Sequence, residues 1–114
     1  MSISPAEIAQ ALIRCPSITP KDEGALHVIA DVLKPLGFDC EFLQFEDVSN
    51  LFARYGDGAP HFCFAGHTDV VPSGPREAWK SDPYMPEVRD GHLYGRGAAD
   101  MKSSLAAFVT GIED

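Results

Sequence analysis

The chain has 114 residues, with 17 Asp and Glu against 9 Lys and Arg, a net charge of −8, and 45% hydrophobic residues. This length suits one domain with its own core, and the composition is typical of a folded globular protein rather than a disordered one. Because phosphate binding depends on clustered Lys and Arg, which are scattered here, we expect no nucleic-acid partner. No apolar stretch approaches the ~18 residues that span a bilayer, so we expect no membrane partner.

The cysteines, Cys15, Cys40 and Cys63, are odd in number and far apart in the sequence. They do not form the close pairs of zinc ribbons or thioredoxin-like sites, so we expect three reduced thiols that act as small apolar residues. The first ten residues lack the basic and long apolar segments of a secretory signal peptide. These features predict a cytoplasmic protein.

Two helices are predicted in the first third of the chain. The first begins at Ser4, which forms a capping box with Pro5 and Glu7. The second begins at residues 19–22, a capping Thr followed by Pro, and ends with Gly37 as its C-terminal cap. Apolar residues recur at helical spacing in each segment: Ile8, Ala11, Leu12 and Cys15 in the first, and Leu26, Ile29, Ala30 and Leu33 in the second.

Strand patterns follow the second helix. Residues 38–45 alternate and are rich in aromatics, and residues 50–55 form a second strand-like run before Gly56. Residues 61–71 begin almost continuously apolar, which is typical of a central strand covered on both faces. We therefore expect three or four strands in this part of the chain.

The last third combines a loop, a hairpin and a helix. Residues 72–86 contain four prolines and predict a long loop, and Asp90-Gly91 predicts a type I′ hairpin turn. Residues 104–112 return to a helical pattern. The whole order predicts an α/β fold with helices packed on a mixed, largely parallel sheet. Since a parallel sheet usually continues after such a helix, the sequence reads as part of a larger domain.

The segment with the clearest chemistry is Gly66-His67-Thr68-Asp69. Residues two apart in a strand share a face, so His67 and Asp69 are expected on one side, at the end of a strand where α/β sheets place ligands. The imidazole could bind a metal while the carboxylate fixes its tautomer, or it could act as a general base oriented by the carboxylate. A pair that only satisfies its own hydrogen bonds is a third interpretation.

A second segment, residues 95–102, places glycines between a strand and a helix. It fails as a dinucleotide fingerprint because Asp100 stands where the third glycine is needed, and a carboxylate repels phosphate. Asp100 suits a cation, or it caps the last helix, although Ser103 or Ser104 could do that instead. If the loop and hairpin return the chain beside its starting strand, His67 and Asp100 converge on one ion, for which the imidazole favours Zn²⁺.

Two aromatic residues of the loop and two arginines have simpler interpretations than substrate binding. Trp79 and Tyr84 lie in the proline-rich loop and are expected to anchor it rather than bind substrate. Arg76 and Arg96 could steer an anionic substrate, but Arg96, between two glycines, fits better as an ion-pair partner that holds the loop.

The spacing of these motifs resembles the dinuclear-zinc aminoacylase and carboxypeptidase family. The resemblance rests on GHTDVVPSG, on Trp79, on SDPY, on DGHLYGRG and on AADMKSSLAA, between about residues 62 and 105. It implies a zinc-exopeptidase-like catalytic domain of which residues 1–114 form the amino-terminal part, in a protein that is a homodimer at full length. The AADMK form is similar to members that hydrolyse N-succinyl-LL-2,6-diaminopimelate; a deacylase of the acetylornithine type, a carboxypeptidase and a non-catalytic fragment remain alternatives.

The same resemblance implies roles for three residues. His67 would be a zinc ligand, Asp100 a carboxylate bridging two Zn²⁺ ions (with Co²⁺ as an alternative metal), and Asp69 the catalytic carboxylate that steadies the imidazole. The bond between Asp100 and Met101 is expected to be cis. The family's paired glutamates, one of them the general base, and its remaining ligands would lie after Asp114. Since a catalytic zinc needs three protein ligands, we expect this polypeptide alone to be inactive and to bind zinc weakly.

Overall fold

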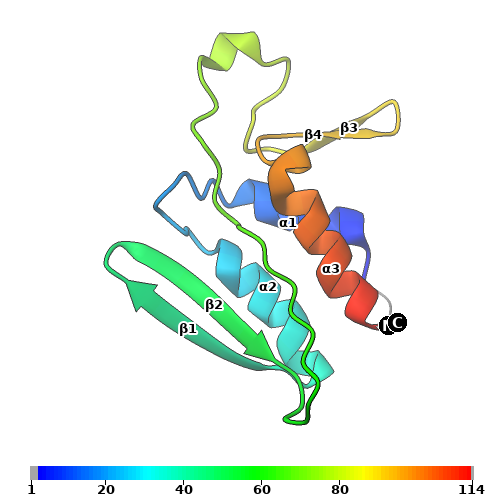
Figure 1. Ribbon diagram of the computed structural model, residues 1–114. Helices are drawn as coiled ribbons and strands as arrows, with labels where there is room; N and C mark the ends of the chain where they lie inside the picture. The colour runs from blue at the N-terminus through cyan, green and yellow to red at the C-terminus, as the bar shows by residue number, and fades with distance from the viewer. Residues whose placement is uncertain (1–2, 114) are drawn as a thin grey trace.

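The computed structural model describes residues 3–113, in which three helices pack together beside a long β-hairpin, and a second, short hairpin lies near the start of the last helix (Figure 1). Both sheets are two-stranded and antiparallel. The elements are α1 (Pro5–Arg14), α2 (Ala25–Leu33), β1 (Asp39–Phe45), β2 (Val48–Arg54), β3 (Glu87–Arg89), β4 (His92–Tyr94) and α3 (Ser103–Glu113).

The core lies where the three helices meet. Leu12 and Ile13 of α1, Ala30 of α2 and Ala106 of α3 are fully buried. These side chains belong to the apolar stripes of their helices, so the periodicity that predicts each helix also decides which face is buried. The small Ala side chains let the helices approach closely, and burial of these stripes provides most of the hydrophobic stabilisation.

The helix boundaries differ in detail from the predicted ones. α1 begins as expected with Pro5 in its first turn, but the Ser4 side chain makes no capping hydrogen bond. The predicted start of the second helix at residues 19–22 is wrong, because α2 begins at Ala25. The Asp22 carboxylate accepts hydrogen bonds from the backbone N–H groups of Gly24 (3.2 Å) and Leu26 (3.0 Å). Asp22 therefore satisfies donors at the start of the helix that Thr19 was expected to satisfy.

The predicted hairpin turn, loop and last helix are confirmed. Asp90 and Gly91 have φ of 52° and 78° between β3 and β4, as a type I′ turn requires. Residues 72–86 form a loop with one short 3₁₀ turn, Arg76–Ala78. α3 covers the residues that returned to helical spacing. The chain excursion between residues 71 and 97 thus returns to the helical core.

The predicted central strand at residues 61–71 is wrong, and with it the largely parallel sheet. The only parallel pairing within residues 3–113 is an isolated bridge between Ile18 and Val70. Residues 61–67 are exposed although most are apolar; Phe62 retains 84% of its surface and Phe64 57%. No strand of the described chain reaches their backbone, so this segment has the composition of a central strand without the neighbours that would make it one.

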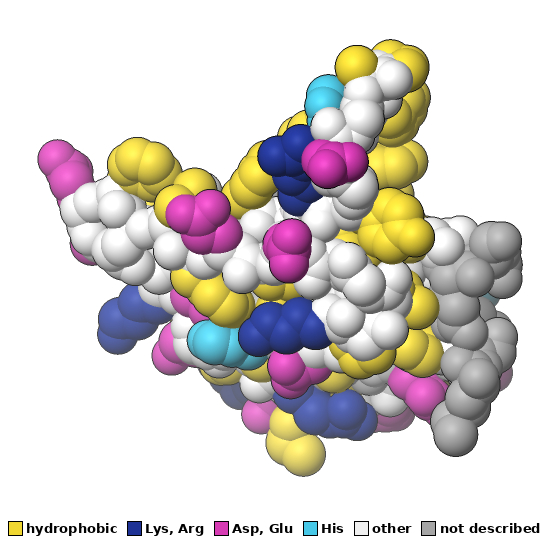
Figure 2. All heavy atoms as spheres, turned by 90° about the horizontal axis from the view of Figure 1, so that it is seen from below, with side chains coloured by type: hydrophobic (Ala, Val, Ile, Leu, Met, Phe, Trp, Pro, Cys, Tyr) yellow, Lys and Arg dark blue, Asp and Glu magenta, His cyan; other side chains and the backbone are white. Residues whose placement is uncertain are grey.

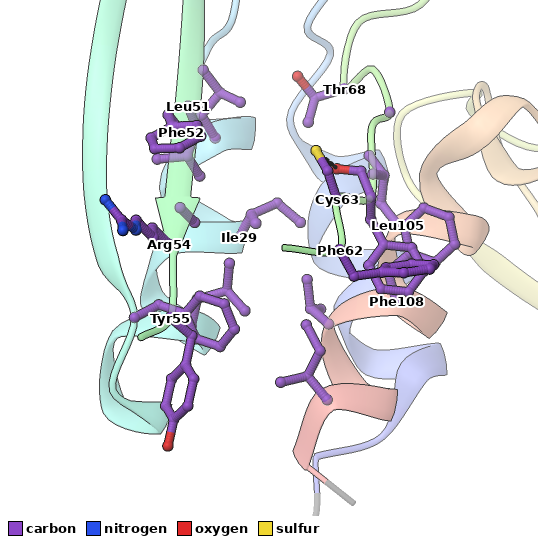
Figure 3. A pocket seen from close by; sticks show the side chains of 18 of the residues that line it. Ile29, Leu51, Phe52, Arg54, Tyr55, Phe62, Cys63, Thr68, Leu105 and Phe108 are labelled. Atoms are coloured by element: carbon purple, nitrogen blue, oxygen red, sulfur yellow. Dashed lines mark hydrogen bonds between the residues drawn. The ribbon is translucent and has the colours of Figure 1, made fainter. Parts of the chain in front are cut away.

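A groove of about 630 Å³ separates β2 from this segment (Figure 3). Leu51 and Phe52 line one side and Phe62 the other, while Ile29 of α2 and Phe108 of α3 also line it. We call this the apolar groove. The groove therefore lies between β2 and residues 61–67, and no strand of the described residues fills it.

Charges on the surface are mixed. On the face shown in Figure 2, Asp and Glu side chains lie between the Lys and Arg side chains, with hydrophobic side chains among them.

All three cysteines are free, and burial raises the pKa of the Cys15 and Cys40 thiols. Within residues 3–113, every helix is too short or too polar to cross a bilayer.

A candidate metal site at His67 and Asp100

His67 and Asp100 are 33 positions apart in sequence, yet the fold brings their side chains together. The His67 Nε2 atom lies 3.0 Å from Asp100 Oδ1. The other ring nitrogen, Nδ1, lies 3.0 Å from the Asp69 carbonyl oxygen and 3.3 Å from its carboxylate oxygen Oδ1. The imidazole is therefore held between two aspartates, one on each nitrogen.

Asp69 lies on the same side as His67, as the two-residue spacing predicted, although no strand forms here. The side chains of His67 and Asp69 remain 48% and 43% exposed, and that of Asp100 87%. The site is open to solvent, so a cation or a small molecule can reach it directly.

The turn before α3 places Asp100. Gly97 adopts a left-handed conformation, with φ of 87°, and the chain then leaves helical geometry at Asp100 and Met101 before α3 begins at Ser103. The Asp100–Met101 peptide bond is cis, as the family resemblance implied. Asp100 Oδ1 contacts His67 Nε2 and not a backbone N–H group at the start of α3. The alternative in which Asp100 caps the last helix is therefore wrong for this contact.

The donor set fits a divalent metal ion in part. Two ligands about 2.0–2.1 Å from a tetrahedral zinc lie about 3.3 Å apart, so the 3.0 Å contact needs to open by only a few tenths of an ångström. A histidine whose other nitrogen donates to a carboxylate or carbonyl is the usual zinc-ligand arrangement. Among residues 3–113, no group of three or more His, Cys, Asp or Glu side chains could hold a metal. The chain thus presents two donors and the outer partner of one of them.

We expect a pKa above 6.5 for the His67 imidazole. The hydrogen bond to the Asp69 carbonyl is the largest cause and raises the pKa, desolvation lowers it, and the hydrogen bond and charge of Asp100 raise it further. Because the folded-state pKa is raised, the protonated ring stabilises the fold below about pH 6.5. That contribution is lost as pH rises through the folded value. Zn²⁺ replaces the proton on Nε2, so metal affinity should increase over the same range.

An NMR titration of the His67 ring protons measures this pKa. Asp100→Asn should lower it, whereas Asp57→Asn, which changes an exposed carboxylate in another turn, should leave it unchanged. A pKa at or below 6.5 in the native chain would contradict the observed ring contacts.

Two residues near this site were not singled out by sequence reasoning. Lys102 is fully buried and its ammonium donates to two carbonyls at the end of α1, while burial lowers its pKa to about 8. Ser17 is also fully buried, between α1 and the segment after His67. The available signal for the burial of Lys102 was spacing: Lys102, one residue before α3, precedes the buried Ala106 by four residues and Val109 by seven, which is the spacing of one helix face.

The proline-rich loop is held by its aromatic residue and an arginine. Trp79 Nε1 donates to the Ser73 carbonyl at 3.0 Å, which confirms that Trp79 anchors the loop. The guanidinium of Arg96 lies 5.2 Å from the Trp79 ring centre and donates to the carbonyls of Ser73 (3.3 Å) and Pro72 (3.5 Å). Arg96 therefore holds the loop as predicted, but through carbonyls and a ring rather than the expected ion pair.

Comparison with known proteins identifies relatives for the whole chain. The sequence model described as Peptidase family M20/M25/M40 matches residues 63–114, which include His67, Asp69 and Asp100. A succinyl-diaminopimelate desuccinylase of Wolbachia pipientis subsp. Culex pipiens (strain wPip) is 58% identical over 115 residues, covering 100% of this chain and 29% of its own length. Another, from Azoarcus sp. (strain BH72), is 62% identical over 106 residues, covering 93% of this chain and 28% of its own length.

A solved structure has the same fold over this length. The crystal structure of human carnosine dipeptidase 1 matches with a TM-score of 0.75 and 28% identity, covering 96% of this chain and 28% of that one. This chain therefore spans less than a third of the length of the relatives it matches. The chain is thus similar in sequence to part of the succinyl-diaminopimelate desuccinylases, similar over residues 63–114 to peptidase family M20/M25/M40, and similar in fold to part of carnosine dipeptidase 1.

Proposed function

We propose that this chain is the amino-terminal part of the catalytic domain of a metal-dependent amidohydrolase. The enzyme hydrolyses N-succinyl-LL-2,6-diaminopimelate to succinate and LL-2,6-diaminopimelate, a step in lysine biosynthesis. The observation that carries the proposal is the approach of His67 Nε2 to Asp100 Oδ1 at 3.0 Å, with Asp69 on the other ring nitrogen. The substrate is supported by the names of the relatives that are 58% and 62% identical.

In this proposal His67 and Asp100 would hold Zn²⁺, with the Asp100 carboxylate shared between two ions; Co²⁺ is the alternative metal. Bound zinc supplies a Lewis acid for the scissile carbonyl and lowers the pKa of a coordinated water. Asp69 keeps the proton on His67 Nδ1, so that the lone pair of Nε2 faces the metal. The Asp100 side chain is 87% exposed, and its Oδ1 atom already faces His67 Nε2.

A second candidate is a peptidase activity on a small dipeptide. It is favoured by the structural match to carnosine dipeptidase 1, although at 28% identity this match is far weaker than that to the desuccinylases. An acetylornithine-type deacylase is a third member of the same reaction class. All three activities cleave an amide bond and would use the same two metal ligands. Substrate preference therefore distinguishes the three candidates, whereas the metal site does not.

We also propose a cytoplasmic homodimer as the working form of the complete enzyme, with a small-molecule substrate as its partner. The acidic composition and dispersed basic residues agree with a small-molecule partner rather than a polyanion. Sedimentation of a full-length relative carrying this segment would report the dimer.

A chimera tests the proposed function directly. This chain replaces the matching segment of the Azoarcus desuccinylase, which is 62% identical to it over 106 residues. We expect the chimera to hydrolyse N-succinyl-LL-2,6-diaminopimelate in preference to N-acetylornithine and to carnosine. The unmodified Azoarcus enzyme is the control for each substrate.

A folded chimera that binds zinc but does not hydrolyse the succinyl substrate would contradict the proposal. Preference for the dipeptide would favour the second candidate instead. The isolated 114-residue chain should show no hydrolysis, because its described residues bring only two ligands together.

A further inference from the structure

Lys102 connects the turn that carries Asp100 to the end of helix α1. Its side chain is fully buried, and Nζ donates at 2.8 Å to the carbonyl oxygens of both Leu12 and Cys15. The Leu12 carbonyl also accepts the Cys15 N–H at 3.1 Å, and Cys15 follows α1 as its C-cap, so the ammonium lies at the C-terminal end of the helix, where the helix dipole favours a cation. Two carbonyl acceptors at this end explain how a lysine is accommodated in the core without a carboxylate.

Ser17 connects the segment that carries His67 to the same point. Its Oγ lies 3.1 Å from both the Cys15 carbonyl and the Thr68 carbonyl. The Ser17 carbonyl in turn accepts from the N–H of Val70 at 3.0 Å, and the Val70 carbonyl accepts from the N–H of Thr19 at 2.9 Å. The residues on both sides of Asp69 are thereby tied to the chain just after α1.

The carbonyl of Cys15 is common to both sets of contacts, because Lys102 Nζ and Ser17 Oγ each lie within hydrogen-bond distance of it. Lys102 follows Asp100 by two residues, and Thr68 is the residue after His67. The ligand side chains themselves are exposed, and no strand pairing holds residues 66–69 in place. Besides their own contact, the link between the two segments is a hydrogen bond from the His67 N–H to Met101 Sδ at 3.4 Å.

We propose that Lys102 and Ser17 are positioning residues that set the separation of His67 and Asp100 for a metal ion. This inference rests on the proposed metal site. Lys102 acts by holding the Asp100 turn against α1, and Ser17 by holding the His67 segment against the same carbonyl. Neither side chain touches the metal or the substrate.

The test is a titration of the metal-free Azoarcus chimera described above with Zn²⁺, followed by the NMR signals of the His67 ring. Lys102→Met keeps an apolar side chain of similar length but removes both hydrogen bonds, and it should weaken Zn²⁺ binding about 10-fold, as loss of an outer partner of a metal ligand does. Ser17→Ala should weaken binding in the same direction. Thr110→Val is the matched control. It removes a buried hydrogen bond within α3, from Thr110 Oγ1 to the Ala106 carbonyl at 2.8 Å, and should not change the affinity for Zn²⁺.

A double-mutant cycle separates positioning from a general loss of stability. In an Asp100→Asn background, Lys102→Met should have no further effect on Zn²⁺ affinity, because the ligand it positions is gone. If Lys102→Met does not fold, the Ser17→Ala variant decides the question alone.

The outcomes distinguish the two proposals. An unsubstituted chimera without any Zn²⁺-dependent change at His67 would overturn the metal site and this inference together. An unsubstituted chimera that binds Zn²⁺, with variants that bind equally well, would overturn the positioning role alone, even if the variants are less stable.

Discussion

Asp100→Asn should lower kcat/KM of the chimeric desuccinylase for the succinyl substrate by more than 100-fold. An amide has no charge to balance a divalent cation, and its nitrogen cannot take the place of a bridging carboxylate oxygen. Loss of an outer partner typically costs about 10–100-fold in activity or metal affinity, so loss of a ligand should cost more. Steady-state kinetics together with zinc analysis of the purified variant measure both consequences.

Two further substitutions show whether the effect follows the proposed roles. Asp69→Asn removes the carboxylate charge 3.3 Å from His67 Nδ1 but keeps the Asp69 carbonyl that lies 3.0 Å from the same atom, and the loss should not exceed about 10–100-fold. Asp57→Asn changes an exposed turn carboxylate and should leave kcat/KM unaltered. Full activity and zinc content in the Asp100 variant would remove Asp100 from the site.

Gly97→Ala should lower the free energy of unfolding of the chain by about 2–5 kcal/mol. At φ of 87°, a residue with Cβ costs about 1–2 kcal/mol. A Cβ here would also lie 2.7 Å from Val70 Cγ1 and 3.1 Å from Lys102 Cδ, and overpacking of this kind costs about 1–3 kcal/mol more. Urea denaturation followed by circular dichroism measures the change.

Gly56→Ala is the matched control, because Gly56 also has a positive φ of 76° but open space around its Cβ position. It should show only the conformational part, about 1–2 kcal/mol. Equal losses in the two variants would mean that the contact with Val70 and Lys102 adds nothing. A Gly97 variant as stable as the native chain would contradict the left-handed turn itself.

The sequence predicts the local structure of this chain well where a single segment determines it. The apolar stripes of α1 and α2 identify both helices and their buried faces, and Asp90-Gly91 identifies the β3–β4 turn. Thr19 was a misleading signal because Asp22, three residues later, has a carboxylate that reaches two backbone donors. Helix starts depend on such side-chain contacts, and several residues near each start can make them.

Features that depend on distant partners were less accessible. Residues 61–71 have the pattern of a central strand, but a strand also needs hydrogen-bonding neighbours, which composition does not supply. The approach of His67 to Asp100 could be anticipated, since a loop and a hairpin return the chain to its starting point. The buried ammonium of Lys102 could not, because its partners are backbone carbonyls of α1, and carbonyls leave no signature in a sequence.

The apolar groove has a consequence for the behaviour of the isolated chain in solution. The edge of β2 that does not pair with β1, together with the exposed rings of Phe62 and Phe64, favours strand-to-strand association between copies of the chain. Mutual repulsion opposes this, since each copy carries a net charge of −8, but at physiological ionic strength it is screened beyond about 8 Å. Self-association of the purified polypeptide should therefore increase with salt concentration, and dilute, low-salt buffers should favour the monomer.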